Sequence, residues 1–172
     1  IYGLKKDDEK GIQRSNVNGW HSKNFIIEKD NVPYNFVKAI HEHVKEVIVD
    51  GYGWKYIPEK VGISEIWAII NKKGTFNQSH NHPGSYLSAA YYVKAPENCG
   101  NIHFYEPNEV KKFHTPPIEK MTELSSSGFS VKPEEGNLLI FPSYLYHDVG
   151  KSLSDEDRIV ISFNVSILPI KK

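Results

Sequence analysis

The sequence has one cysteine, no excess of either charge and no long apolar run, and each absence narrows the class of protein. Cys99 alone cannot form a disulfide or a zinc-thiolate cage within the chain, so a reducing, cytoplasmic setting is expected. The 21 basic and 21 acidic residues give a formal net charge of zero. Binding of nucleic acid requires clustered Lys and Arg, and a membrane span requires about 20 apolar residues. We therefore expect neither partner.

What the chain does contain is typical of a globular β protein. Hydrophobic residues make up 39% and aromatic residues 12% of the 172 residues, a content that favours strands around an enclosed pocket over a helical bundle. A chain of this length suits one domain with a sizeable core. The prediction is a single domain over residues 1–172, with an N-terminal extension over 1–60 and a β core over 61–172.

One helix is predicted, within the N-terminal extension. Apolar residues recur at helical spacing between positions 36 and 48, which is the pattern of one buried helix face. Asp30 or Asn31 can cap the start of such a helix, and Pro33 suits its first turn. We therefore expect an amphipathic helix over residues 33–49.

From residue 64 onward the pattern changes to short extended segments separated by turn residues. Many short strands with turn signals between them favour an antiparallel sandwich or jelly roll. The predicted fold is mainly β, a double-stranded β-helix (jelly roll, cupin-like) with the N-terminal helix packed on it. Its expected strands occupy residues 64–71, 76–82, 85–93, 101–105, 129–131, 137–141 with a further extended stretch to 149, and 158–168.

Three histidines are candidate metal ligands. His80 and His82 lie two residues apart in an expected strand, and because residues i and i+2 share a strand face, both imidazoles can point toward one ion. His147 closes a strongly apolar run and is the third candidate, with His103 as its only rival. Paired histidines are more often surface residues, and a lone histidine is more often a hydrogen-bonded core residue, so the spacing of further elements decides between these interpretations.

Arg158 opens the last predicted strand and shares a face with Ser162. A planar guanidinium with a hydroxyl alongside suits a carboxylate, although a surface salt bridge to an acid at positions 155–157 is the ordinary alternative. The order H-x-H, then a histidine 65 residues later, then an arginine 11 residues on, is typical of a facial-triad iron site on a jelly roll. One side of such a metal stays open for a bidentate oxo-acid and O₂.

In this order the chain resembles the 2-oxoglutarate/Fe(II)-dependent oxygenase superfamily, in its prolyl-hydroxylase-like branch of bacterial and phage proteins. The resemblance covers roughly residues 64–168, in blocks at 71–83, 88–93, 136–147 and 158–164. It implies Fe(II), 2-oxoglutarate as co-substrate, and O₂. It implies that His80, His82 and His147 are the catalytic metal ligands, that Arg158 pairs with the distal carboxylate of 2-oxoglutarate, and that Tyr92 is a hydroxyl donor to that carboxylate. Further cofactor-binding candidates come from position: Ser162 and Ser88 share strand faces with Arg158 and Tyr92, and Asn71 either lines the pocket or belongs to the turn that follows it.

One position departs from the commonest pattern of that superfamily, which has Asp or Glu where this chain has His82. A neutral imidazole leaves the charge of the ion uncompensated by the protein. Two other interpretations stay open: a three-histidine cupin-type dioxygenase that does not use 2-oxoglutarate, and a non-enzymatic jelly-roll binding module. The expected substrate is a small molecule or peptide, with a peptidyl or free amino acid as the first hypothesis. Loops at 52–63 and 106–128 are expected to surround the mouth of the barrel.

Overall fold

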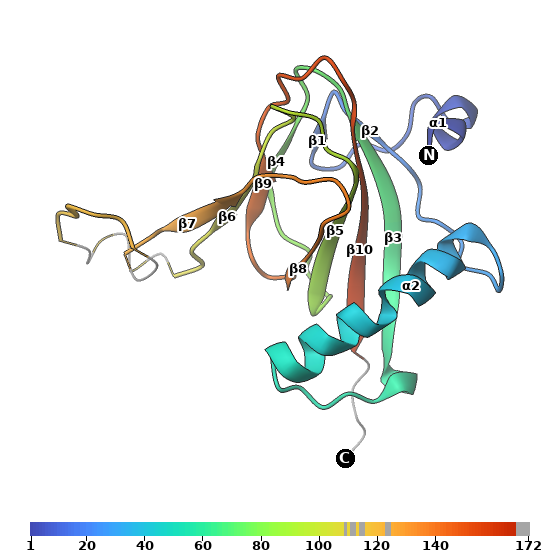
Figure 1. Cartoon of the computed structure of the whole chain (residues 1–172), viewed down its shortest axis with the longest axis horizontal. Helices are drawn as coiled ribbons and strands as arrows, with labels where there is room; N and C mark the ends of the chain where they lie inside the picture. Colours follow the sequence, from blue (N-terminus) through green and yellow to red (C-terminus); the bar gives the residue numbers. More distant parts are fainter. Residues whose placement is uncertain (109, 111–112, 114–115, 123–124, 168–172) are drawn as a thin grey trace.

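Two five-stranded antiparallel sheets form the body of the protein in the computed structural model, which describes residues 1–108, 110, 113, 116–122 and 125–167 (Figure 1). The elements in chain order are α1 (Tyr2–Asp7), β1 (Asn16–Val17), β2 (Trp20–His21), α2 (Val32–Glu46), the π-helix η1 (Val47–Gly51), the 3-10 helix η2 (Pro58–Lys60), β3 (Val61–Asn71), β4 (Phe76–His80), β5 (Leu87–Lys94), β6 (Ile102–Tyr105), β7 (Gly128–Val131), β8 (Leu138–Pro142), β9 (His147–Val149) and β10 (Arg158–Ile167).

From β3 onward the chain passes back and forth between the two sheets, apart from the β6–β7 hairpin, as it does in a double-stranded β-helix. One sheet has the order β1-β4-β9-β6-β7, and the other, the major sheet, has the order β2-β3-β10-β5-β8. The last strand, β10, lies between β3 and β5, with Arg158 opposite Asn71 and Asn164 opposite Glu65. The predicted jelly-roll fold is confirmed. Position 168, where the last strand was expected to end, lies outside the described residues.

Helix α2 covers the outer face of the major sheet (Figure 1). It begins at Val32, one residue before the predicted start, because Asn31 Oδ1 accepts a hydrogen bond from the Tyr34 amide at 2.9 Å and Pro33 occupies the first turn. Its buried residues Ile40 and Val44 pack on a cluster of sheet residues. Removal of this apolar surface from water is the main contribution of the helix to stability.

Strand periodicity sorts the side chains of the major sheet into two sets. In β3, Ile66, Ala68 and Ile70 are fully buried on the side of the helices, whereas the alternate residues line a cavity on the other side. The same alternation places Arg158, Val160, Ser162 and Asn164 of β10 in that cavity. Period-two alternation therefore separates an apolar outer layer from a polar interior between the sheets.

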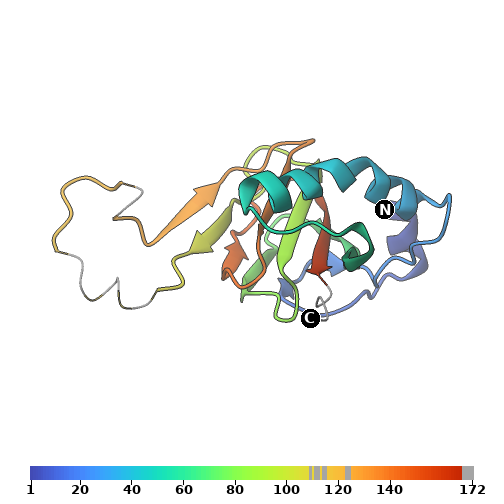
Figure 2. The ribbon, with the colours of Figure 1, turned by 90° about the horizontal axis from the view of Figure 1, so that it is seen from below.

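The N-terminal 60 residues are more closely integrated with the sheets than the sequence indicates. Strand β1 pairs with β4 in one sheet, and β2 pairs with β3 in the other. The division of the chain at residue 60 stays a prediction. At the other end of the molecule, the β6–β7 hairpin extends away from the body (Figure 2). No helix among the described residues is long and apolar enough to cross a membrane.

Candidate metal and co-substrate site

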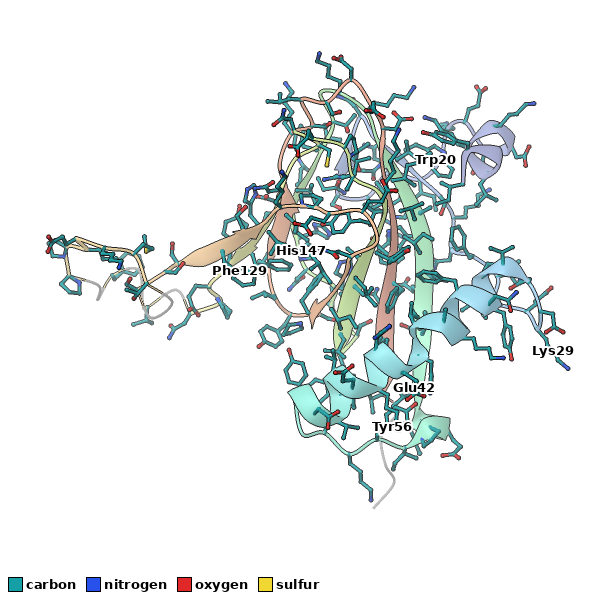
Figure 3. The ribbon with its side chains drawn as sticks, viewed as in Figure 1. Trp20, Lys29, Glu42, Tyr56, Phe129 and His147 are labelled. Carbon is teal, nitrogen blue, oxygen red and sulfur yellow. The ribbon has the colours of Figure 1, made fainter. Side chains whose placement is uncertain are left out.

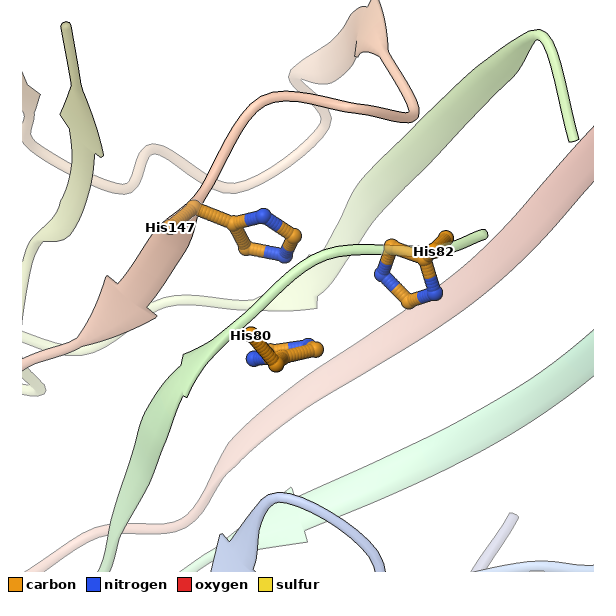
Figure 4. Close-up of side chains that lie close together, drawn as sticks. All are labelled: His80, His82 and His147. Carbon is orange, nitrogen blue, oxygen red and sulfur yellow. The ribbon is translucent and has the colours of Figure 1, made fainter. Parts of the chain in front are cut away.

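His80, His82 and His147 converge on one point between the sheets (Figure 4). One ring nitrogen from each histidine lies within 4.8 Å of the others. His80 ends β4 and is paired in register with His147, which begins β9. Figure 3 shows His147 inside the body, whereas Phe129 lies on the projecting hairpin. The pairing of β4 with β9 thus brings together two histidines that lie 67 positions apart in the sequence.

His82 lies beside His80 as predicted, but the predicted reason, a shared strand face, is wrong. Strand β4 ends at His80, so His82 does not share a strand face with it. Instead, the chain turns after His80, and the His82 amide donates a hydrogen bond to the Ser143 carbonyl at 2.9 Å. This bond fixes the loop, and the His82 ring centroid lies 5.1 Å from that of His80 and 5.3 Å from that of His147.

Hydrogen bonds orient two of the three imidazoles. His80 Nδ1 lies 2.7 Å from the Gln78 carbonyl, and His147 Nδ1 lies 3.0 Å from the Leu145 carbonyl. A carbonyl can only accept, so Nδ1 carries the proton in both rings, and Nε2 keeps its lone pair. The Nε2 atom of His80 lies 3.3 Å from the Ser15 hydroxyl, which can donate to it. Such carbonyl partners are the usual way in which a protein orients metal-binding histidines.

Burial keeps these histidines neutral. It lowers the pKa of His82 to about 3, with the neighbouring His80 and His147 rings as smaller contributors. Burial likewise lowers the pKa of His147 to about 4 and lowers the pKa of His80. Three neutral imidazoles present lone pairs at neutral pH, a donor set that suits Fe(II) and other first-row divalent metals. The residues present therefore fit a metal ion.

Arg158 is a buried cation without an anionic partner in the described part of the chain. Its side chain is 2% exposed, its Nη1 donates to the Gly100 carbonyl at 3.1 Å, and its Nε has no partner. The surface salt bridge considered from the sequence is wrong: the nearby acids Asp155 and Glu156 pair with lysines, and Asp157 accepts from Tyr2. Burial lowers the pKa of Arg158, and a buried guanidinium of this kind needs an anion.

Tyr92 lies beside Arg158 in the same cavity. It is 3% exposed, and burial raises the pKa of its hydroxyl to about 12, an effect that the charge of Arg158 opposes. The hydroxyl is therefore a proton donor at neutral pH, and it makes no hydrogen bond to any described residue. Asn71 and Ser162 also line the cavity. The Asn71 side-chain amide donates to the Thr75 hydroxyl at 3.1 Å, and its carbonyl oxygen has no hydrogen-bond partner among the described residues.

Two sequence candidates lie away from the cavity lining. Ser88 is 1% exposed, and its hydroxyl is engaged with the Ser143 hydroxyl and with Asn164 Oδ1, each at 2.9 Å. His103, the rival third ligand, is hydrogen-bonded to Asp148 at 2.6 Å, and Asp148 also accepts from the Tyr105 hydroxyl. His103 is thus separate from the three-histidine cluster.

The cavity has a volume of about 520 Å³ and contains residues that the sequence did not single out. Trp67 lies against His82, with ring centroids 5.8 Å apart, and its buried indole N–H has no hydrogen-bond partner in the part of the chain that the structure describes. Glu65 and Arg14 are exposed residues that also line it. The signal available in the sequence was parity: Glu65, Trp67 and Ile69 precede Asn71 at intervals of two in one strand.

The fold and the site together define a jelly-roll protein with a three-histidine metal centre beside a buried cation. Residues 65–164 match the model of a family described as "Putative 2OG-Fe(II) oxygenase". The chain belongs to this family of 2-oxoglutarate/Fe(II)-dependent oxygenases. It is therefore an oxidoreductase that uses Fe(II), 2-oxoglutarate and O₂. The open alternatives, a dioxygenase that does not use 2-oxoglutarate and a non-enzymatic module, are not favoured.

Solved structures share the fold at low sequence identity. A Pseudomonas putida prolyl-4-hydroxylase is 14% identical with a TM-score of 0.62, over 96% of this chain and 82% of that protein. HygX from Streptomyces hygroscopicus, solved with nickel and 2-oxoglutarate, is 12% identical with a TM-score of 0.57, over 96% and 77%. A Burkholderia pseudomallei oxidoreductase of the 2OG-Fe(II) oxygenase family is 12% identical with a TM-score of 0.51. The match covers 73% of this chain and 55% of that protein. A comparison with curated protein sequences finds no match.

Proposed function

We propose that the protein is a hydroxylase that couples decarboxylation of 2-oxoglutarate to oxidation of a peptidyl or free amino acid. His80, His82 and His147 hold the metal in this proposal, and Arg158 and Tyr92 bind the distal carboxylate of the co-substrate. The observation that carries it is the presence, in one cavity, of three convergent neutral imidazoles and a buried guanidinium without an anionic partner.

Each side chain has a role that follows from its surroundings. The carbonyl partners of His80 and His147 hold Nδ1–H and leave Nε2 available for a metal. Arg158 supplies charge and Tyr92 supplies a hydroxyl proton, the two features that a buried carboxylate requires. Fe(II) with 2-oxoglutarate, when bound, supplies the activation of O₂ for attack on a C–H bond. The cavity walls exclude water around this chemistry, which strengthens the electrostatic contacts inside.

Two structural relatives support an amino-acid substrate. The Pseudomonas putida protein is a prolyl-4-hydroxylase. The viral collagen prolyl hydroxylase from Paramecium bursaria Chlorella virus-1, solved with 2-oxoglutarate, is 15% identical with a TM-score of 0.55, over 88% of this chain and 81% of that protein. At such identity the likeness establishes the fold, and the substrate class is part of the proposal.

Anaerobic titration tests this function. Fe(II) and then 2-oxoglutarate are added to the metal-free protein, and the visible metal-to-ligand charge-transfer band is expected only when both are present. His147→Ala should abolish the band. His103→Ala is the matched control, because His103 lies outside the cluster, and it should retain the band. Absence of the band in the wild-type protein would refute the proposed co-substrate site.

A further inference from the structure

Glu65 is a carboxylate at the solvent-exposed edge of the cavity that contains the three histidines. It comes from β3, directly opposite Asn164 of β10 in the register of the major sheet. Asn164 Nδ2 donates to Glu65 Oε2 at 2.7 Å. Asn164 itself is 2% exposed, so a buried amide holds an exposed carboxylate in place.

The amide of Asn164 is one link in a longer buried chain of hydrogen bonds. Ser143 and Ser88, 0% and 1% exposed, join their hydroxyls at 2.9 Å, and Ser88 donates to Asn164 Oδ1 at 2.9 Å. Asn164 donates its N–H to Glu65 and accepts at Oδ1 from Ser88, so the single hydroxyl proton of Ser88 is already used. The Ser143 hydroxyl must therefore donate to Ser88, and all three hydrogen bonds point toward the carboxylate. The Ser143 carbonyl meanwhile accepts from the His82 amide at 2.9 Å. Glu65 is thus fixed relative to the segment that carries His82.

The Glu65 carboxylate has no cation to satisfy it in the described part of the chain. Only one of its oxygens has a hydrogen-bond partner there, and no ion pair involves it. Arg14 also lines the cavity but is exposed, and its guanidinium makes no hydrogen bond to a described residue. Arg14, Glu65 and His21 all line the same cavity. Of the two charges, only that of Glu65 is held in a fixed position by buried groups.

The position of Glu65 suits a group on a molecule that reaches the histidines. Trp67 contacts His82, and Glu65 precedes Trp67 by two residues on the same strand face, a separation of roughly 7 Å along the strand. A substrate that reaches both places would therefore have several bonds between the carbon beside the histidines and the polar group at Glu65. Fixed carboxylates with one unsatisfied oxygen bind ammonium and guanidinium groups through charge-assisted hydrogen bonds.

We infer that the Glu65 carboxylate, held by Asn164, Ser88 and Ser143, is a substrate-recognition site for a cationic group, an ammonium or a guanidinium, on the molecule that is oxidised. This inference rests on the proposed function, because it takes the histidine cavity as the active site. A free basic amino acid and a basic residue within a peptide share this chemistry. The experiment separates these two sources.

Binding of matched probe pairs to the Fe(II)- and 2-oxoglutarate-loaded protein under anaerobic conditions tests the inference. The free pairs are L-arginine with L-citrulline and L-lysine with L-norleucine, and the blocked tripeptides carry the same side chains between glycines. Calorimetry should give at least tenfold tighter binding for the cationic member in one of the two formats. Glu65→Gln, which keeps an acceptor for Asn164, should remove this preference. Glu59→Gln removes a similar exposed charge outside the cavity and should retain it.

Two results would overturn the inference. One is equal binding, or no binding, of the cationic and neutral members in both formats. The other is a cationic preference that survives in Glu65→Gln, since another group would then recognise the cation. The charge-transfer band with 2-oxoglutarate is measured on each variant, so that loss of the co-substrate site is distinguished from loss of substrate recognition.

Discussion

Replacement of Arg158 by Gln should weaken 2-oxoglutarate binding while leaving the metal site intact. The guanidinium is 2% exposed and has no anionic partner among the described residues, so its expected partner is the carboxylate of the co-substrate. A hydrogen bond to a charged group contributes about 1.5–3 kcal/mol, which corresponds to about a 10- to 150-fold increase in the dissociation constant. Gln retains a donor for the Gly100 carbonyl and keeps the site polar.

The effect can be measured through ligand-induced stability. A ligand at 100 times its dissociation constant stabilises the folded state by about 2.7 kcal/mol, and a 30-fold loss of affinity reduces this to about 0.9 kcal/mol at the same concentration. Chemical unfolding of the Fe(II)-loaded protein with and without 2-oxoglutarate, under anaerobic conditions, measures both quantities. Fe(II) affinity should change little, because no histidine contacts are lost. An Arg158→Gln variant that keeps the full 2-oxoglutarate stabilisation would refute the assigned role of Arg158.

Three further predictions concern the same cavity. Tyr92→Phe should raise the Michaelis constant for 2-oxoglutarate by about fivefold, the equivalent of about 1 kcal/mol for one hydrogen bond, and steady-state assays would contradict this by showing an unchanged constant. His82→Ala should abolish stable Fe(II) binding while His82→Asp retains it, and iron occupancy that is indifferent to His82→Ala would remove His82 from the site. The metal-free protein should lose stability as the pH falls from about 6.5 toward 4. The pKa values of His82 and His147 are lowered in the folded state, so the unfolded state binds more protons in that range. Urea unfolding should show that the free energy of unfolding depends less on pH in His82→Ala than in the wild type.

Much of the fold and the centre of the site could be predicted because the relevant signals are local and periodic. Turn residues between short extended segments located the strands, and strand parity placed Arg158 and Ser162 on one face of the last one. The capping residue Asn31 and the apolar spacing after it predicted helix α2, which was observed at Val32–Glu46 with a continuation to Gly51. The convergence of the three histidines followed from their order along a jelly roll, since β4 and β9 are neighbours in that topology.

What could not be predicted depends on hydrogen bonds between distant segments. His82 lies beyond the end of β4, held by Ser143, and no strand periodicity describes that loop. Ser88 has the expected parity, yet its hydroxyl is engaged with Ser143 and does not line the cavity. Glu65 is a charged residue in a strand, a pattern that usually marks a solvated face. Only the structure shows that this face forms the edge of the cavity.

The replacement of a carboxylate by His82 changes the charge balance of the whole cavity. Three neutral imidazoles contribute no negative charge, and Arg158 adds a positive one without an anion among the described residues. A divalent metal ion would make the interior more positive still. The dianion of 2-oxoglutarate is then the principal compensating charge available, so metal and co-substrate should bind with positive coupling, each raising the affinity of the other by the same factor. In an oxygenase with a carboxylate ligand, part of that compensation is built into the protein. We therefore expect the all-histidine site to bind its metal more tightly when 2-oxoglutarate is present, and Glu65, at the exposed edge of the cavity, is the carboxylate that we propose for the substrate.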